Sequence, residues 1–160
     1  MIAVGCDHAG YELKQEVISH LTEKGYEIMD LGCNGESCDY PIIAKAVAEN
    51  ILNKKCDKGI LICGTGIGMS IAANKIHGIR AALCSDYFSA KYTRLHNDAN
   101  VMCIGARTIG VGLALELADV FLETEFEGGR HQRRLDLIHE IENISDLALS
   151  LIHISEPTRH

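Results

Sequence analysis

The chain has 160 residues, 47% of them hydrophobic, and a mean hydropathy of +0.06, so it is long and apolar enough to bury one core. Fifteen Lys and Arg stand against 22 Asp and Glu, and the net charge of -7, without any basic run, argues against nucleic acid as a partner. No apolar run approaches the roughly 20 residues of a membrane span, and the chain opens without a basic leader, so we expect a cytoplasmic protein with no membrane contact.

Strands and helices are expected to alternate along the chain. Short β-branched runs predict strands at residues 1–5, 27–31, 59–63, 79–84 and 101–105. The first helix is indicated by Leu13, Val17 and Leu21, which recur every four residues among polar neighbours that include Lys14, and Gly25 is placed to end it. Further helices are expected from Pro41, after Gly68, and over 87–95, 109–122 and 130–149.

This alternation predicts an α/β fold. Apolar strands joined by helices favour a parallel sheet covered on both faces, and right-handed crossovers give a three-layer α/β/α sandwich around a doubly wound, five-stranded parallel sheet, Rossmann-like or flavodoxin-like. A TIM barrel needs about 250 residues. We expect one domain over residues 1–150 and, over 151–160, a frayed end or residues of vector origin. Ligands of such sheets bind beyond the carboxyl ends of the strands.

Seven cysteines occur, an odd number with no Cys-x-x-Cys pair, which favours neither a disulfide framework nor a zinc site. We expect most of them to be small buried hydrophobic residues in a reducing compartment. A catalytic cysteine must therefore be identified from its neighbours. The seven are Cys6, Cys33, Cys38, Cys56, Cys63, Cys84 and Cys103.

The end of the first strand carries Asp7 and His8 side by side in a loop. A carboxylate next to an imidazole can handle protons or bind hydroxyl groups. The alternative is that Asp7 only caps the following helix and His8 is a solvated neighbour. The residues of this stretch leave both interpretations open.

The end of the third strand is the most informative segment, because Cys63 is followed by glycines at 64, 66 and 68 and then by a helix. Alternating glycines let the backbone turn tightly and point N–H groups into one concavity, so the segment predicts an anion or oxyanion cradle. Met69 stands where a dinucleotide motif has its last glycine, and no P-loop lysine follows. Backbone dipoles there favour a thiolate, which suggests a general base, although Cys63 could equally be a core cysteine at a strand end.

His96 and Asn97 are expected on a helix-to-strand loop, at the edge of the sheet opposite the strand carboxyl ends. Either they act in the site of a neighbouring subunit, or Asn97 is a helix stop and His96 a surface residue.

Arginines follow the fifth strand and open the last helix. Arg107 is at the active edge, and Arg130 and Arg134 lie four residues apart, with Arg133 between them. Cations in a first turn oppose the helix dipole by about 0.3 to 1 kcal/mol each when exposed, so an anionic ligand is the economical explanation. The guanidinium geometry suits a phosphorylated small molecule, and the alternative is a solvated patch paired with nearby glutamates.

Five motifs in this order over residues 1–142 resemble the ribose-5-phosphate isomerase B family, within a wider group that includes galactose-6-phosphate and allose-6-phosphate isomerases. Cys63 fits the branch of that group that uses a cysteine base. The motifs are Gly5-Cys6-Asp7-His8-Ala9-Gly10, Asp39-Tyr40-Pro41, Ile62-Cys63-Gly64-Thr65-Gly66-Ile67-Gly68, His96-Asn97-Asp98 and Glu127-Gly128-Gly129-Arg130-His131.

The resemblance implies a single sugar-phosphate isomerase domain that interconverts ribose 5-phosphate and ribulose 5-phosphate without metal or cofactor, as a homodimer with shared active sites or a dimer of dimers. Cys63 is then the base at C2 and C1, and His96 the acid that opens the sugar ring. The implied catalytic residues are Cys63, His96, Thr65 and Asp7. The implied substrate-binding residues are Asp7, His8, Tyr40, Gly64, Thr65, Gly66, Ile67, Gly68, Ser70 and Asn97. The implied phosphate-binding residues are His8, Arg107, Arg130 and Arg134.

Three alternatives remain open from the residues. One is isomerisation of a 6-phosphohexose, allose or galactose 6-phosphate. Another is a sensor that binds a sugar phosphate without turning it over. The third is a flavodoxin-like mononucleotide binder, which we rank last because only 5% of the residues are aromatic and none is Trp.

Overall fold

The structure is a computed structural model that describes the backbone of residues 1–155 and the side chains of residues 1–144 and 148–152. The chain forms two compact units, Met1–Phe126 and the segment from Glu127 onward. Helix α6 (Arg130–Ser155) makes up most of the second unit and continues beyond the predicted end near residue 149. It takes in the first half of the predicted tail, and 156–160 lie outside the described residues. Within the described part, no helix has both the length and the apolar character that crossing a membrane requires.

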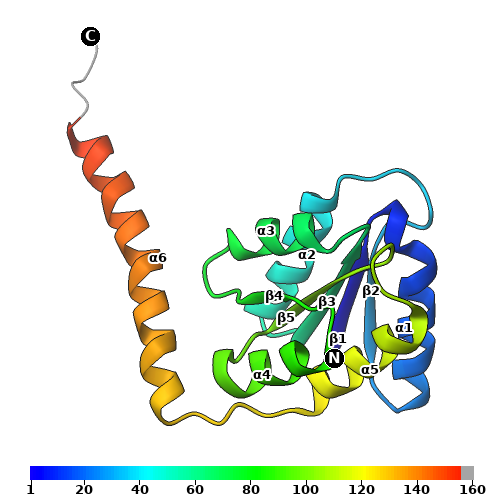
Figure 1. Cartoon of the computed structure of the whole chain (residues 1–160). Helices are drawn as coiled ribbons and strands as arrows, with labels where there is room; N and C mark the ends of the chain where they lie inside the picture. Colours follow the sequence, from blue (N-terminus) through cyan, green and yellow to red (C-terminus); the bar gives the residue numbers. More distant parts are fainter. Residues whose placement is uncertain (156–160) are drawn as a thin grey trace. The chain divides into compact units, whose positions relative to one another are not determined.

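A parallel sheet of five strands lies at the centre of the first unit, in the order β2-β1-β3-β5-β4 (Figure 1). The order reverses between β1 and β3, so the ends of these two strands form the topological switch point. Cys6 of β1 pairs with Ile62 of β3, and Cys63 pairs with Gly105 of β5. The strands are β1 (Ile2–Cys6), β2 (Ile28–Gly32), β3 (Lys58–Cys63), β4 (Ala81–Leu83) and β5 (Val101–Gly105).

Helices cover both faces of this sheet, which confirms the predicted three-layer α/β/α sandwich. One face packs against α1 (Tyr11–Glu23), α4 (Tyr87–Asn97) and α5 (Val111–Glu123). The other face packs against α2 (Tyr40–Leu52) and α3 (Ile67–Asn74). A short 3₁₀ helix, η1 (His8–Gly10), leads from β1 into α1.

The residues of β3 alternate between the two cores because successive side chains of a strand point to opposite faces. Ile60 and Ile62 pack with α1 and α5, whereas Leu61 and Cys63 pack with α2 and α3. All four are buried, which explains why β3 appears in the sequence as an unbroken apolar run. Cys63 is therefore directed toward the side of the sheet on which α3 begins.

Helix α1 shows where the periodicity was right and where it was incomplete. Leu13, Val17 and Leu21 are buried against the sheet as predicted, and the helix ends before Gly25, whose φ is 95°. Lys14 was expected on the polar face but is fully buried. Its Nζ lies 2.6 Å from Oδ1 of Asp30 on β2, and this ion pair compensates for the burial of the charge.

Candidate active site

The glycine-containing loop after β3 places a main-chain donor on the sulfur of Cys63. The N–H of Gly66 donates a hydrogen bond to Sγ of Cys63 across 3.1 Å. Gly66 has a left-handed conformation with φ of 80° and is the residue from which α3 starts. The loop is shorter than predicted, because Ile67 and Gly68 already belong to the first turn of α3. The predicted concavity of N–H groups at a helix N-terminus is thus built by residues 64–68.

Gly66 is required by its conformation and by its surroundings. A Cβ atom at Gly66 would lie 2.6 Å from Cδ1 of Leu83 and 2.9 Å from the carbonyl carbon of Ile104. The neighbouring strand end is equally tight, since a Cβ atom at Gly105 would lie 2.7 Å from Cα of Thr65. The loop therefore packs backbone against backbone on the end of β5, and a side chain would push its N–H groups away from Cys63.

Cys63 differs from the other buried cysteines in having this donor at the edge of the sheet. Its exposed fraction is 5%. Burial raises the pKa of Cys84 to about 12, and burial also raises the pKa of Cys103. A raised pKa keeps a thiol protonated at neutral pH, so neither of these two cysteines is suited to act as a base.

Asp7 lies next to Cys63 and has a structural contact of its own. Its N–H donates to the carbonyl oxygen of Ile62 across 3.2 Å, which places it beside the end of β3. Its Oδ1 accepts hydrogen bonds from the N–H groups of Ala9 and Gly10 at 3.0 and 3.2 Å. Asp7 is thus the cap of η1, as the structural alternative predicted, while the neighbouring His8 is exposed at the same edge.

Two further predicted residues reach the same loop from other elements. A Cβ atom at Gly64 would lie 3.5 Å from Nη1 of Arg107, so the guanidinium group packs beside the loop. A Cβ atom at Gly68 would lie 2.7 Å from Cζ of Tyr40, so the tyrosine ring packs directly on the first turn of α3. The structure therefore brings an aromatic hydroxyl and a cation to the mouth of the loop that holds Cys63.

The two hydroxyl side chains of the predicted site have local partners. Oγ1 of Thr65 accepts a hydrogen bond from the N–H of Ile67 at 3.2 Å, and Thr65 is otherwise exposed. The hydroxyl of Ser70 donates to the carbonyl oxygen of Ile67 at 2.7 Å. Both contacts stabilise the beginning of α3, and Thr65 keeps its hydroxyl hydrogen available at the loop.

His96 and Asn97 are helical, which corrects the prediction that they lie on a loop. They form the last turn of α4, which ends only where Asp98 takes a left-handed conformation with φ of 45°. Arg94 fixes this end by donating from Nη1 to Oδ1 of Asp98 at 2.8 Å and to the carbonyl oxygen of Ala99 at 2.7 Å. Because α4 leads into the beginning of β5, His96 lies at the opposite end of the sheet from Cys63. Five residues of strand at about 3.3 Å each separate these two edges by roughly 16 Å.

The side chains of His96 and Asn97 line a cavity of about 370 Å³ between α4 and β4. The imidazole of His96 meets the ring of Tyr92 edge-on at 5.0 Å, and Tyr92 stacks on Phe88 at 4.1 Å. Phe88 is 65% exposed. This row of aromatic rings was not predicted, although positions 88, 92 and 96 have the four-residue spacing that places side chains on one face of a helix.

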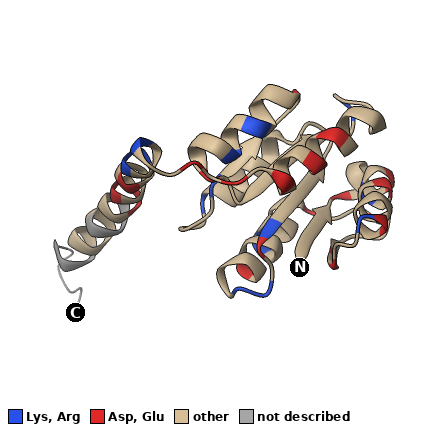
Figure 2. Ribbon diagram, turned by 90° about the horizontal axis from the view of Figure 1, so that it is seen from below, with Lys and Arg blue, Asp and Glu red and all other residues tan. Residues whose placement is uncertain are grey.

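The remaining predicted phosphate ligands, Arg130 and Arg134, stand in the first turns of α6 in the second unit. No acidic residue occupies this first turn, and Figure 2 shows the beginning of the helix in the colour of Lys and Arg. His131 lies 3.4 Å from Oε2 of Glu127 within the same unit. The arginines therefore form a basic helix start, as the sequence predicts.

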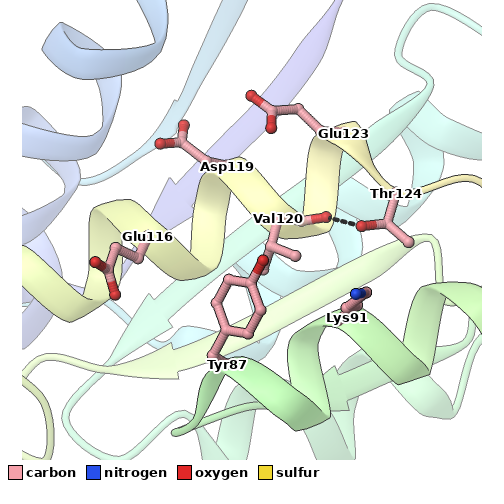
Figure 3. Close-up of a pocket in the computed structure, with 7 residues that line it drawn as sticks. All are labelled: Tyr87, Lys91, Glu116, Asp119, Val120, Glu123 and Thr124. Carbon is pink, nitrogen blue, oxygen red and sulfur yellow. Dashed lines mark hydrogen bonds between the residues drawn. The ribbon is translucent and has the colours of Figure 1, made fainter.

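A different cavity, also of about 370 Å³, lies between α4 and α5 (Figure 3). Glu116, Asp119 and Glu123 line it, and Lys91 is the one cation in the lining. Asp119 is already paired, at 2.9 Å, with both His20 and Lys24. The net negative lining repels a phosphorylated ligand, so this cavity is not the binding site for one.

No three metal-ligating atoms of His, Cys, Asp or Glu come within coordination range of one another inside the first unit, as far as residues 1–126 are described. The loop at Cys63 therefore offers backbone N–H groups, a thiol and a guanidinium group as its chemical means. These groups suit the stabilisation of a developing oxyanion and the transfer of a proton.

Comparison with known proteins gives one consistent result. Residues 2–138 match the family model described as Ribose/Galactose Isomerase. Ribose-5-phosphate isomerase B of Escherichia coli is 50% identical over 142 residues, which cover 88% of this chain and 95% of that protein. Ribose-5-P isomerase B of Listeria innocua is 53% identical over 142 residues, 88% of this chain and 96% of that protein. The solved structure of Clostridium thermocellum ribose-5-phosphate isomerase B superposes with a TM-score of 0.88 at 49% identity, covering 90% of this chain and 98% of that one.

Proposed function

The chain belongs to the ribose/galactose isomerase family, and we propose that it interconverts ribose 5-phosphate and ribulose 5-phosphate in the cytoplasm by proton transfer at Cys63. The observation that carries this proposal is the hydrogen bond from the N–H of Gly66 to Sγ of Cys63, at a helix N-terminus with the guanidinium group of Arg107 alongside. A base held in this way can face a substrate carbon while the same loop receives the oxygens of that substrate.

In the proposed reaction, the thiolate of Cys63 removes the proton from C2 of the open-chain aldose and becomes a thiol. The electron pair moves onto the carbonyl oxygen, which gives an enediolate. The N–H groups of residues 64–68 bind the two enediolate oxygens, and the hydroxyl group of Thr65 assists proton movement between them. Cys63 then returns the proton to C1, so the base is regenerated and no redox partner is consumed.

The other predicted residues have binding roles in this proposal. Asp7, His8 and Tyr40 contact the sugar hydroxyls, and Ser70 supports the loop from the first turn of α3. Arg107, Arg130 and Arg134 bind the phosphate together with His8. These roles are consistent with a single anionic substrate, whose phosphate lies away from the reacting carbons.

We propose a homodimer with shared sites because His96 and Cys63 lie at opposite edges of the sheet within one chain. A second subunit would bring His96 to the partner site, where it acts as the acid that opens the furanose ring, with Asn97 adding a hydrogen bond. The exposed ring of Phe88 and the cavity beside His96 are consistent with a covered surface at this place. The dimer could associate further into a tetramer.

The proposal is tested by mixing the protein with ribose 5-phosphate in heavy water. We expect ribulose 5-phosphate to form and deuterium to enter at C2, because the proton on a thiol exchanges with solvent between removal and return. A protein that binds the sugar phosphate but leaves C2 unlabelled is a sensor, and the proposal would then be wrong. A kcat/KM higher for allose 6-phosphate or galactose 6-phosphate would reassign the substrate to a hexose.

Removal of the basic start of α6 should weaken binding of the phosphate. We expect the double substitution Arg130→Gln and Arg134→Gln to raise KM for ribose 5-phosphate by about 100-fold, because each charge-assisted hydrogen bond contributes roughly 1.5 kcal/mol or more. Arg133→Gln, in the same turn, is the control and should change KM little. Steady-state kinetics measure all three. An unchanged KM in the double variant, or an equal rise in the control, would make the arginines a solvated patch.

A further inference from the structure

Three thiols meet where the loop of residues 33–39 leaves β2. Sγ of Cys33 donates to the carbonyl oxygen of Cys6 at 3.7 Å, and Sγ of Cys6 donates to the carbonyl oxygen of Cys33 at 3.9 Å. The thiol of Cys38 lies within hydrogen-bonding reach of both the thiol and the main-chain N–H of Cys33. Cys33 is therefore in contact with the other two, and none of the three has a part in the proposed reaction.

The thiols differ in accessibility. Cys6 is fully buried in the core, whereas Cys33 and Cys38 are both half-buried and can be reached by a small solute. Burial raises the pKa of Cys6 to about 12, and burial together with the Cys33 thiol raises the pKa of Cys38 to about 11. These two thiols stay protonated at neutral pH, which leaves Cys33 as the thiol that reacts first.

The surroundings of Cys33 are electropositive. The buried ammonium group of Lys14 donates to the carbonyl oxygen of Cys33 at 3.5 Å and pairs with Asp30 on its other side. A cation next to a half-exposed cysteine is the environment in which oxidation-sensitive thiols are found.

We propose that Cys33 and Cys38 form a reversible disulfide when the protein meets a hydroperoxide, so that the loop between β2 and α2 is a redox modification site. The sulfur of Cys33 attacks the hydroperoxide, the O–O bond breaks, and a sulfenic acid forms while water or an alcohol leaves. The thiol of Cys38 then attacks this sulfur, the S–S bond forms and a second water leaves. Two thiols are oxidised and one hydroperoxide is reduced.

The loop can accommodate this bond and release it again. Residues 33–39 form neither helix nor strand, and Gly35, with φ of 93°, lets the chain turn back between the two cysteines. The backbone can therefore adjust to the narrow geometry that a disulfide requires. The closed loop is short, so the bond stabilises the fold little, and exposed disulfides of this kind are readily reduced.

The same loop controls a residue at the proposed substrate site. It ends at Asp39, directly before Tyr40, whose ring packs on Gly68 in the first turn of α3. At its other end, Gly35 lies against the ring of Tyr11, 3.7 Å from a Cβ position. Closing the disulfide pulls the loop together between these two contacts. We therefore expect it to displace Tyr40 and weaken substrate binding, a consequence that rests on the proposed function.

The disulfide is tested by mass spectrometry. The reduced protein is treated with hydrogen peroxide, its remaining thiols are alkylated, and it is digested with trypsin. Cleavage after Lys24 and Lys45 places Cys33 and Cys38 in one peptide, 25–45, while Cys6 falls in peptide 1–14. We expect peptide 25–45 to lose the mass of two hydrogens and to take up no alkyl group, and dithiothreitol to restore two alkylations.

Two outcomes would overturn the proposal. One is a cross-link between peptides 1–14 and 25–45, which would assign the bond to Cys6. The other is sulfinic or sulfonic acid at Cys33 without any S–S bond. Cys38→Ser should abolish the disulfide, whereas Cys56→Ser, in a buried position outside the loop, should leave it intact. These readouts do not depend on turnover, so they stand or fall separately from the isomerase activity.

The effect on the site is measured on the same samples. Oxidation should raise KM for ribose 5-phosphate severalfold in the unaltered protein, dithiothreitol should reverse the rise, and Cys38→Ser should show neither change. A loss of kcat that is equal in both proteins would place the functional damage at Cys63 and contradict the link between this loop and Tyr40.

Discussion

Replacing Cys63 with alanine is expected to abolish isomerisation, with a loss in kcat of at least about 10³-fold, and to stop deuterium entry at C2. The reason is that no other described group at the loop can take the proton: Cys103 packs in the same core but burial raises the pKa of its thiol, and Asp7 is committed to capping η1. Substrate binding should persist, because the arginines and the loop N–H groups remain. The measurements are NMR of the C2 proton in heavy water and ribose 5-phosphate binding by calorimetry.

Cys103→Ala is the matched control for this substitution. Cys103 is fully buried on β5, on the same side of the sheet as Cys63, so its loss removes a sulfur from the same core. We expect Cys103→Ala to lower the free energy of unfolding by about 1 kcal/mol and to leave turnover near normal. Thermal unfolding shows whether each variant is folded. Turnover retained in a folded Cys63→Ala protein would remove Cys63 from its proposed role.

The loop at Cys63 could be predicted from sequence because its signal is local. Glycines at alternate positions between an apolar run and a helix indicate a backbone turn with N–H groups on one side, and the structure confirms this with the left-handed Gly66. The position of Arg107 at the same edge also follows from chain order, since parallel strands end together. What spacing could not give is the contact between Tyr40 and Gly68, which depends on how α2 packs against α3.

The errors have a common physical origin in tertiary contacts. His96 was expected beyond the end of α4, but the ion pair between Arg94 and Asp98 and the left-handed turn at Asp98 carry the helix two residues further. Lys14 was expected in solvent, but Asp30 on the adjacent strand compensates its charge and permits burial. Side-chain partners from distant parts of the chain override local preference in both cases.

The contact between Cys33 and Cys38 was likewise outside the reach of pattern analysis. Four residues separate them, a spacing that matches no disulfide or metal motif, and only the path of the loop after β2 brings their thiols together. The sequence suggested only that most cysteines are buried. That holds for five of the seven, and the two half-buried exceptions are the pair in this loop.

Replacing Gly66 with alanine is expected to reduce kcat/KM by about 10²- to 10³-fold, the usual loss when a main-chain donor leaves an oxyanion site. An added Cβ atom would meet the side chain of Leu83 at 2.6 Å and the backbone of Ile104 at 2.9 Å. Leu83 can turn aside, but Ile104 belongs to the middle of the sheet and cannot. The loop must therefore move, and the N–H of Gly66 moves away from Sγ of Cys63, to which it now donates at 3.1 Å.

Gly25→Ala separates this steric effect from the cost of the left-handed conformation itself. Gly25 has φ of 95°, close to the 80° of Gly66, and a Cβ atom there would meet nothing within 4 Å. Both variants pay about 1 to 2 kcal/mol for placing an L-residue in this conformation. We expect Gly25→Ala to show only that loss in the free energy of unfolding, with normal turnover. If Gly66→Ala lost stability by the same amount and kept its activity, the loop N–H groups would not be holding the reacting atoms.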